Sequence, residues 1–369
     1  MKILYLTNIP APYRVNFFNE LGKMCDLTVL FERSDASDRD NQWFENKNEN
    51  YKAIFLKGKK IRSDSAISFE VLKYLKKKFD IVIVGGYSTP TGMLAINYLK
   101  LKRIPFVLNA DGGLIKKDEH WFKRAIKKYY ISNADYWLST GKEVSKYFQY
   151  YGASPNRIFI YPFTSIQEES LLKKPLEKKM KNMFKENLSI NEEKIILSIG
   201  RFINIKGFDV LLRACKSLPR NYGVYIVGGK PTKEYLKLKE ELKLSNVHFI
   251  DFKSKKELKD YYMASDLFVL PTREDVWGLV INEAMSYGLP VITTDKCVAG
   301  VELIKNSENG YIVPVNDTGM LEKRLNEILE NDMIAERMSR KNLDDIKEYT
   351  IEKMALEHIN IFKSILSKV

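Results

Sequence analysis

Two stretches of the chain carry polar side chains of the kind that bind phosphorylated ligands. The first reads GRFINIKG over residues 200–207, and it sets Arg201 and Lys206 beside Gly200, after an apolar strand pattern and before a helical one. A helix N-terminus offers unpaired N–H groups and the positive end of a dipole, so cations placed there favour a diphosphate ligand. The spacing matches neither a P-loop nor a GxGxxG loop, and a loop with incidental basic residues is the alternative.

The second stretch reads PTREDVWGLVINEAM over residues 271–285. Glu274 and Asp275 fall in a strand-to-helix loop, where carboxylates can accept hydrogen bonds from sugar hydroxyls, and Gly278 precedes the helix that carries Glu283. Acidic residues near a helix N-terminus also stabilise the helix dipole, which would explain Glu274 and Asp275 without a ligand. A charged Glu283 on a mostly apolar helix costs free energy unless it is paired, so the sequence predicts a partner or ligand for it.

Two further groups lie in the first half of the chain. The strand pattern 105–109 runs into Asp111, and a carboxylate at the carboxyl end of a strand is well placed to contact a sugar hydroxyl, unless it only forms a turn. Residues 116–130, KKDEHWFKRAIKKYY, interleave aromatic with basic residues, which predicts a helix at an anionic membrane surface or, alternatively, a helix that packs its aromatics into the domain. The candidates for membrane contact are Trp121, Lys123, Arg124, Lys127 and Lys128.

Alternating strands and helices must position these residues. Apolar runs of strand length alternate with helical windows, which predicts βαβ units and a parallel sheet. In the first half, strands are expected at 3–7, 27–31, 53–56, 81–85 and 106–109, and helices at 14–23, 66–78 and 91–101. In the second half, strands are expected at 194–200, 224–227, 247–250, 267–270, 290–294 and 310–313, and helices at 207–217, 232–242, 255–264 and 278–287.

Between these halves, near 165–190, polar and charged residues displace the alternation. The sequence therefore predicts two doubly wound α/β domains facing each other across a cleft, over 1–168 and 169–348. At the end of the chain, apolar residues recur at helical spacing, which predicts a helix over 349–369 that packs back toward the first domain.

Length and composition exclude several classes of protein. A chain of 369 residues, 45% hydrophobic and 29% charged, is globular and long enough for two domains. Three widely spaced cysteines give neither a disulfide framework nor metal-ligand spacing, and they suit the reducing cytoplasm. We expect no signal peptide and no membrane span, because no window reaches about 18 apolar residues.

The net charge of +13 is unevenly placed. Residues 51–150 alone hold 20 basic and 8 acidic residues. This excess predicts that the first domain faces an anionic surface or substrate, with a lysine-rich composition and solvated faces as the alternative.

Taken together, the chain resembles a known family. The similarity extends over nearly its whole length and is strongest over 195–320, including EAMSYGLPVI at 283–292 and NGYIVPVND at 309–317. These motifs are similar to those of retaining glycosyltransferases of GT-B architecture in glycosyltransferase family 4, the glycosyl transferases group 1. The resemblance implies two Rossmann-like domains, the first for the acceptor and the second for a nucleotide-sugar donor. It implies transfer of a hexose-type sugar with retention, in bacterial surface polysaccharide or glycolipid biosynthesis.

The resemblance also implies roles for single residues. Arg201 and Lys206 would bind the donor diphosphate and neutralise its charge as it leaves, while the leaving phosphate takes the acceptor proton. Glu283 would bind the donor ribose as the second acid of an E-x7-E motif, whose first acid falls on Asp275 in place of the usual Glu. Because Glu274 lies beside it, which carboxylate reaches the sugar stays open. Donor-lining residues would be Gly200, Val276, Trp277, Gly278 and Leu279, and the expected catalytic set is Arg201, Lys206, Asp275 and Asp111.

The first domain departs from the family pattern. No glycine pair follows its first strand, and Asp111 stands where relatives carry a histidine that none of His120, His248 and His358 matches. Acceptor-side candidates are Pro12, Tyr13, Arg14, Asp111 and Gly112.

The resemblance implies a UDP- or GDP-activated sugar as donor and a lipid-linked sugar acceptor, with peripheral contact with the cytoplasmic membrane. No metal, cofactor or nucleic acid is expected. The alternatives are a GT-B-related sugar-nucleotide epimerase and, outside the enzymes, a basic nucleic-acid-binding protein.

Overall fold

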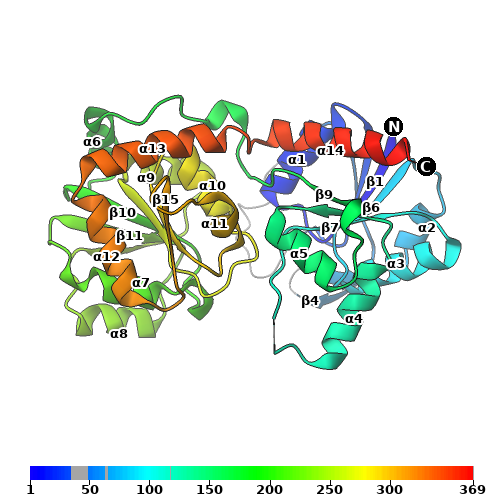
Figure 1. The fold of residues 1–369 in the computed structure, drawn as a ribbon, viewed down its shortest axis with the longest axis horizontal. Helices are drawn as coiled ribbons and strands as arrows, with labels where there is room; N and C mark the ends of the chain where they lie inside the picture. The colour runs from blue at the N-terminus through cyan, green and yellow to red at the C-terminus, as the bar shows by residue number, and fades with distance from the viewer. Residues whose placement is uncertain (35–48, 63–64, 117, 369) are drawn as a thin grey trace. The chain divides into compact units, whose positions relative to one another are not determined.

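The computed structural model describes residues 1–34, 49–62, 65–116 and 118–368 of the chain. The chain divides into two compact units, one formed by Met1–Gln167 with Tyr349–Val369 and the other by Glu168–Glu348. Each unit has a central sheet with helices packed around it (Figure 1). The prediction of two doubly wound α/β domains is confirmed.

A seven-stranded parallel sheet forms the centre of the first unit, in the order β3-β2-β1-β6-β7-β8-β9. Strands such as β6 are buried along their whole length, as expected where helices cover both faces of a sheet. The strands are β1 (Lys2–Thr7), β2 (Asp26–Phe31), β3 (Lys52–Phe55), β6 (Ile81–Val84), β7 (Val107–Ala110), β8 (Tyr136–Ser139) and β9 (Ile158–Ile160). The helices are α1 (Pro12–Gly22), α2 (Val71–Leu75), α3 (Pro90–Lys102), α4 (Trp121–Ser132), α5 (Lys142–Tyr150) and α14 (Ile351–Leu366).

The C-terminal helix α14 is part of the first unit and lies along α1 (Figure 1). Its apolar face carries His358, which is 1% exposed and packs between the rings of Phe17 and Tyr161. Its Nδ1 lies 2.7 Å from the Met354 carbonyl oxygen, and burial lowers the pKa of His358 to about 3. His358 is therefore a packing residue between α14 and the rest of the first unit.

A short hairpin replaces the first part of the helix predicted over 66–78. The strands β4 (Lys59–Arg62) and β5 (Ser65–Ile67) pair antiparallel, and the helix α2 begins only at Val71. The hairpin is held from outside the segment, because the Ser68 N–H donates to Thr91 Oγ1 at 3.1 Å. Thr91 Oγ1 in turn donates to the Ala66 carbonyl oxygen at 2.6 Å. These contacts come from α3, so local helical periodicity could not reveal them.

The second unit contains a six-stranded parallel sheet in the order β12-β11-β10-β13-β14-β15. The first strand of this unit therefore lies in the middle, and the order reverses between β10 and β13. The strands are β10 (Lys194–Ile199), β11 (Tyr222–Val227), β12 (Val247–Ile250), β13 (Leu267–Leu270), β14 (Val291–Thr294) and β15 (Gly310–Val313). The helices are α6 (Lys178–Asn187), α7 (Phe208–Ala214), α8 (Lys233–Glu241), α9 (Lys255–Ala264), α10 (Leu279–Ser286), α11 (Val298–Leu303), α12 (Thr318–Leu329) and α13 (Asp332–Ile346).

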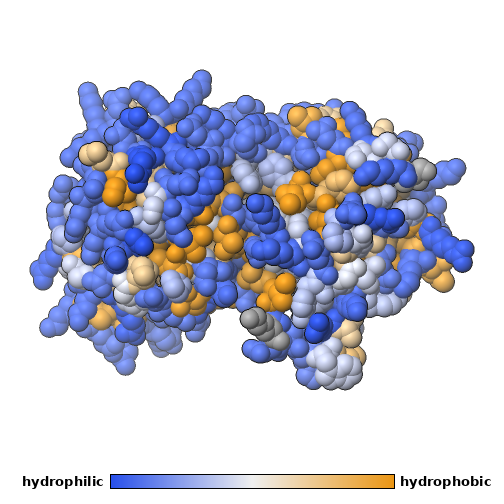
Figure 2. Space-filling view, viewed as in Figure 1, coloured by the Kyte–Doolittle hydropathy of each residue, from blue (hydrophilic) through white to orange (hydrophobic). Residues whose placement is uncertain are grey.

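The core of the second unit joins strands and helices in one apolar cluster, which includes Ile196, Leu211, Val224, Val269 and Leu325. This packing makes the sheet a rigid base for the loops that leave its carboxyl edge. The face shown in Figure 2 is mostly hydrophilic, with smaller apolar patches. Within the ranges that the structure covers, no helix has both the length and the apolar character needed to cross a bilayer.

Candidate active site

The two motif stretches of the second unit meet where its strand order reverses. Strands β10 and β13 are neighbours, and the loops 200–207 and 271–278 leave their carboxyl ends. Ligands of doubly wound sheets bind at this kind of point. Two hydrogen bonds tie the loops together: the Arg273 N–H and the Thr272 hydroxyl both donate to the Ile205 carbonyl oxygen, at 2.7 and 2.8 Å.

Close backbone contact between these loops depends on glycines. Gly207, the N-cap of α7, has φ +68°, and a Cβ there would lie 2.0 Å from the Pro271 carbonyl oxygen. A Cβ on Gly228, after β11, would lie 1.8 Å from the Gly200 carbonyl oxygen. A Cβ on Gly200 itself would meet its neighbours at 3.4 Å or more, an ordinary van der Waals distance. In the sequence, the pair Gly228-Gly229 after a strand pattern is the feature that could have predicted this close contact.

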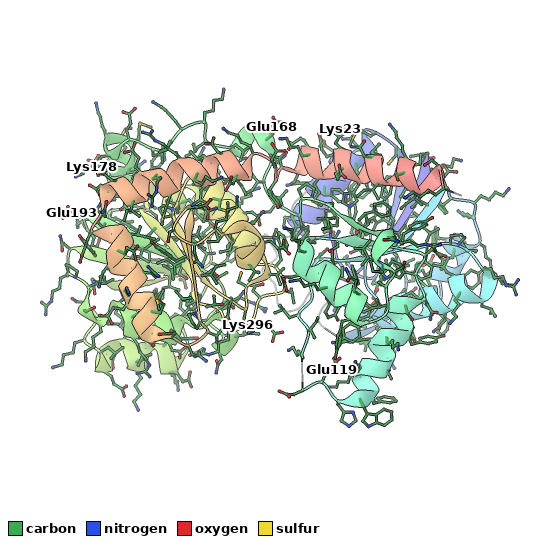
Figure 3. All side chains as sticks on the ribbon, viewed as in Figure 1. Lys23, Glu119, Glu168, Lys178, Glu193 and Lys296 are labelled. Carbon is green, nitrogen blue, oxygen red and sulfur yellow. The ribbon has the colours of Figure 1, made fainter. Side chains whose placement is uncertain are left out.

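Lys206 and Asp275 form an ion pair at the centre of this edge. Lys206 ends a short 3-10 turn, Asn204–Lys206, and its Nζ donates to Asp275 Oδ2 at 2.5 Å. The side chains are 20% and 14% exposed, so the contact is partly shielded from water. The Asp275 N–H donates to the carbonyl oxygen of Lys296 at 2.9 Å, and Lys296 is labelled in Figure 3. Arg201 follows Gly200 at the same end of β10, with an exposed side chain.

Glu283 has the partner that its place on an apolar helix demanded. The Tyr262 hydroxyl, from α9, donates to Glu283 Oε2 at 2.9 Å. Tyr262 is buried, and its ring stacks on Tyr287 with centroids 4.9 Å apart. Burial, together with the nearby Glu283 carboxylate, raises the pKa of Tyr262 well above its usual value, so the hydroxyl keeps its proton and continues to donate. Sequence analysis missed Tyr262, because a tyrosine in a half-polar helix gives no distinct signal.

The backbone of the segment between Asp275 and Glu283 runs along the carboxyl edge of the second sheet. Gly278 has φ +97° as the N-cap of α10, and a Cβ there would lie 2.8 Å from the buried Cys297 Sγ. The Trp277 side chain is 2% exposed and its Nε1–H donates to Asn282 Oδ1 at 2.9 Å, so the indole braces the helix. Val276 is 53% exposed and Leu279, the first residue of α10, is half-buried, as are Glu274 and Asp275.

In the first unit, Asp111 follows β7 and collects hydrogen bonds. Tyr13 Oη donates to Asp111 Oδ2 at 2.9 Å, Asn109 Nδ2 donates to Oδ1 at 3.2 Å, and Arg14 forms an ion pair with Oδ1. Arg14 also donates to the Tyr5 hydroxyl at 2.9 Å. The neighbouring Asp111 and the tyrosine hydroxyls raise the pKa of Arg14, against its burial.

This network changes the view of the acceptor-side candidates. Arg14 is only 3% exposed, and its guanidinium contacts Asp111 and the Tyr5 hydroxyl inside the unit, so its direct contact with an acceptor stays a prediction. Asp111 keeps 28% of its side chain exposed. Pro12 is the first residue of α1, and it, Tyr13 and Gly112 are half-buried at the same carboxyl edge of the sheet.

The helix α4 presents aromatic side chains to solvent. Trp121 and Phe122 are 72% and 55% exposed, whereas Tyr129, 45% exposed, donates its hydroxyl to Asn97 Oδ1 of α3 at 2.9 Å, so the aromatic residues of this helix divide between solvent and the domain. Lys123, Arg124 and Lys128 are exposed as well, and the Arg124 guanidinium lies over the Tyr150 ring. Figure 2 shows pale side chains, of intermediate hydropathy, at the lower end of this helix.

Lys127 differs from the other basic residues of α4. Its Nζ lies 2.5 Å from Glu119 Oε1 and over the rings of Tyr147 and Tyr151, and its side chain is 26% exposed. Glu119, labelled in Figure 3, is 8% exposed and also accepts from the Tyr151 hydroxyl at 2.5 Å. The position of Lys127 on the helix turns its side chain toward α5, so among the predicted membrane-surface residues it is the one that forms an ion pair with a described residue of its own unit. Lys117 of the same stretch lies outside the described residues.

Comparison with known proteins connects this architecture to sugar transfer. Residues 179–345 match the family model described as glycosyl transferases group 1. A sequence relative, an uncharacterized glycosyltransferase of Haemophilus influenzae, is 33% identical over 47% of this chain and 50% of its own length. Another, the N,N'-diacetylbacillosaminyl-diphospho-undecaprenol alpha-1,3-N-acetylgalactosaminyltransferase of Campylobacter jejuni, is 21% identical over 81% of this chain and 80% of its own.

A solved structure shows the same fold over the full chain. The Anabaena protein Alr3699/HepE, crystallised with UDP, superposes with a TM-score of 0.78 at 15% identity, covering 100% of this chain and 99% of that one. The chain therefore has the GT-B fold, and its second unit is similar to the glycosyl transferases group 1 over residues 179–345.

Proposed function

We propose that this protein is a glycosyltransferase that moves a hexose-type sugar from a nucleotide-sugar donor to an acceptor hydroxyl, with retention at the anomeric carbon. One observation carries the proposal. Arg201 and the Lys206–Asp275 pair lie at the reversal point of the second sheet, and Glu283 lies on α10, the helix that follows the same loop, all within the segment that matches the group 1 family. The UDP bound to the structurally similar Anabaena protein supports a nucleotide sugar as the donor.

Each donor group has a counterpart at this edge. The diphosphate would take the Lys206 ammonium and the Arg201 guanidinium, and the sugar hydroxyls would donate to Asp275, which lies against Lys206. The ribose hydroxyls would donate to the Glu283 carboxylate, whose Oε2 also accepts from the Tyr262 hydroxyl. The backbone of residues 276–279, with Gly278 in a left-handed conformation, would line the sugar.

The reaction then needs charge stabilisation more than a strong nucleophile. The bond from the anomeric carbon to the diphosphate oxygen breaks as the acceptor oxygen attacks the same face, and the departing phosphate takes the acceptor proton. Lys206 and Arg201 would stabilise the negative charge that develops on the leaving group. Two cations can stabilise this charge without a divalent ion.

On the acceptor side, Asp111 is the best-placed group of the first unit. Its partly exposed carboxylate lies at the carboxyl edge of the sheet, and Tyr13, Asn109 and Arg14 fix its orientation. A group held in this way would accept a hydrogen bond from a sugar hydroxyl of the acceptor. The diphospho-undecaprenol in the name of the Campylobacter relative supports a lipid-linked acceptor, and hence a place in surface polysaccharide or glycolipid synthesis at the inner face of the cytoplasmic membrane.

The helix α4 would hold the enzyme at that membrane. Exposed Trp121 and Phe122 suit the interfacial layer of a bilayer, and Lys123, Arg124 and Lys128 complement anionic headgroups. In this proposal Lys127 is an internal ion-pair partner and takes no part in docking.

A donor panel tests the proposed reaction. UDP- and GDP-sugars are screened for an increase in Tm, because a ligand that binds the native state raises apparent stability by mass action. The sugar that scores is then supplied with a lipid-linked acceptor, and NMR follows the anomeric proton of the product. Retention of configuration supports the proposal, whereas conversion of the donor to its epimer without acceptor would identify an epimerase.

A further inference from the structure

Arg273 is the most heavily hydrogen-bonded side chain at the donor edge, although no motif pointed to it. It lies two residues before Asp275, in the loop that follows β13. Its guanidinium donates to both oxygens of Asp209, at 2.9 and 2.7 Å, and to the carbonyl and side-chain oxygens of Asn204, at 2.6 and 2.9 Å. Its Nε donates to Asn316 Oδ1 at 2.9 Å.

These contacts join three loops at one edge of the sheet. Asn204 and Asp209 flank Lys206 in the segment after β10, Arg273 itself follows β13, and Asn316 follows β15. Asn316 has φ +63°, so its loop makes a tight turn that presents the side-chain oxygen. The three segments are far apart in the chain, and one planar side chain fixes their spacing.

The contacts bear directly on the position of Lys206. Asn204 begins the short 3-10 turn that Lys206 ends, and the Arg273 N–H donates to the carbonyl oxygen of Ile205 in the middle of that turn. Arg273 therefore holds the turn through its backbone and its side chain together. Asp275 lies two residues after Arg273 in the same loop. The contacts of Arg273 therefore help to set the distance between the Lys206 ammonium and the Asp275 carboxylate, which form the 2.5 Å ion pair.

We infer that Arg273 is a positioning residue of the donor site. It keeps the turn Asn204–Lys206 against the loop that carries Asp275, so that the Lys206 ammonium is already in place when a diphosphate arrives. A preorganised cation binds without the loss of conformational freedom that a mobile loop would suffer. The inference rests on the proposed function, because it assigns the diphosphate to Lys206.

Arg273 could instead be a direct ligand of the diphosphate, but its geometry opposes that role. Its N–H groups donate to five protein oxygens, and both of its terminal nitrogens, Nη1 and Nη2, bind the Asp209 carboxylate. A phosphate would have to displace a carboxylate to reach it. The two roles predict opposite effects for the removal of the Asp209 charge, which makes them separable.

The experiment measures binding of UDP and uridine by calorimetry, on the full chain. For Arg273→Ala we expect UDP to bind about tenfold more weakly while the affinity for uridine changes less than about twofold, because only the diphosphate depends on Lys206. Arg273→Lys, which keeps the charge but not the fork, should resemble Arg273→Ala. Asp209→Asn should weaken UDP binding in the same direction. Arg213→Ala, at an exposed position on the same helix as Asp209, is the matched control and should bind UDP as the parent does.

Two outcomes would overturn the inference. Tighter UDP binding by Asp209→Asn would mean that the released Arg273 guanidinium binds phosphate itself. An equal loss of UDP and uridine affinity in Arg273→Ala would mean that the residue only maintains the fold, and Tm measured on each variant would show that loss directly. If the parent protein binds neither UDP nor GDP, the proposed function fails before this point, so the two failures are distinguishable; if GDP binds in place of UDP, GDP and guanosine serve as the probes.

Discussion

At the scale of single residues, the donor edge is built from contacts between side chains that are distant in the chain. Lys206 and Asp275 are 69 positions apart and yet meet at 2.5 Å. The pair places an ammonium that could bind an anion next to a carboxylate that could accept from hydroxyl donors.

The leaving-group role of the cations predicts a large loss of activity on removal. Lys206→Ala or Arg201→Ala should lower kcat/KM by about 2–4 kcal/mol of transition-state stabilisation, the effect of removing one electrostatic donor. Steady-state kinetics with the donor from the panel measures it. Lys296→Ala removes a 55% exposed lysine from a neighbouring loop and serves as the control. Near-normal kcat/KM in both Arg201→Ala and Lys206→Ala would refute the diphosphate assignment.

The pair of Tyr262 and Glu283 gives a second prediction at this scale. Glu283→Gln should weaken nucleoside diphosphate binding by about 1.5–3 kcal/mol, because an amide cannot accept from two ribose hydroxyls as a carboxylate does. Tyr262→Phe removes only the hydroxyl that donates to Glu283 Oε2, so it should weaken binding less while keeping the carboxylate. Calorimetric titration of both variants decides the matter, and unchanged affinity in Glu283→Gln would make this residue structural.

At the scale of elements, the helix α4 is the clearest case of a surface that its own domain does not use. Trp121 is 72% exposed at the start of the helix, while Ile131 near its end is fully buried. The helix is thus anchored at one end and presents aromatics at the other. Exposed aromatic side chains that lie beside basic residues suit the boundary between headgroups and acyl chains.

This arrangement predicts salt-dependent binding to anionic liposomes. Each surface Lys or Arg should contribute about 1 kcal/mol, and the attraction should fade when salt shortens the Debye length below about 8 Å. Replacing Lys123, Arg124 and Lys128 by Gln should reduce sedimentation with anionic liposomes at low salt, and Trp121→Ala should reduce it further. Hydrolysis of the donor should persist in these variants, because the proposed donor groups belong to the second unit.

Lys127→Gln provides the matched control for that experiment. It removes one positive charge from the same helix, but from a residue that pairs with Glu119 inside the unit. It should leave liposome binding close to that of the parent. A triple variant that sediments as well as the parent would show that α4 is ordinary scaffold and that the lysines reflect composition.

At the scale of the whole molecule, the chain ends by returning to the unit in which it begins. Helix α14 buries Met354, His358 and Phe362 in the first unit, and the Ile351 N–H donates to the Ile166 carbonyl oxygen at 2.8 Å. The stability of the first unit therefore depends on residues that follow the entire second unit in sequence. His358 makes this dependence sensitive to pH.

The neutral state of buried His358 predicts acid destabilisation. Its pKa is about 3 in the folded protein, whereas an unfolded chain has a histidine pKa of about 6.5. Below pH 6.5 the unfolded state binds a proton that the folded state does not, so the free energy of unfolding falls as pH falls, over the range from about 6.5 to about 3. Nearby Arg14 opposes protonation in the same sense.

Urea unfolding at two pH values measures this effect. Between pH 7.5 and 5.5 the contribution of this histidine amounts to about 1.4 kcal/mol of lost stability. His358→Gln cannot titrate, so it should be less stable than the parent at pH 7.5 but should lose less stability on going to pH 5.5. An equal loss in the two proteins would show that His358 is already protonated or already solvated in the fold.

Local sequence patterns determined the elements and the identity of the site segments. The helix predicted over 255–264 and the strands predicted over 267–270 and 310–313 have the predicted bounds, because buried parallel strands read as apolar runs between turn residues. The residue types at Arg201, Lys206, Asp275 and Glu283 likewise predict anion and hydroxyl binding from their own chemistry. What local patterns missed, such as the hairpin of β4 and β5, is held by side chains from another element.

The tertiary structure alone decided which way these side chains face and what they contact. Sequence periodicity gives the spacing of residues on a helix but not the angle at which the helix packs, and a small rotation exchanges an outward residue for an inward one. For this reason Lys127 turned out to pair with Glu119, Arg14 lies buried against Asp111, and Tyr262 and Arg273 emerged as supports of the donor edge. Such contacts join strands and loops that are distant in the chain, and only the order of strands in the folded sheet brings them within hydrogen-bonding distance.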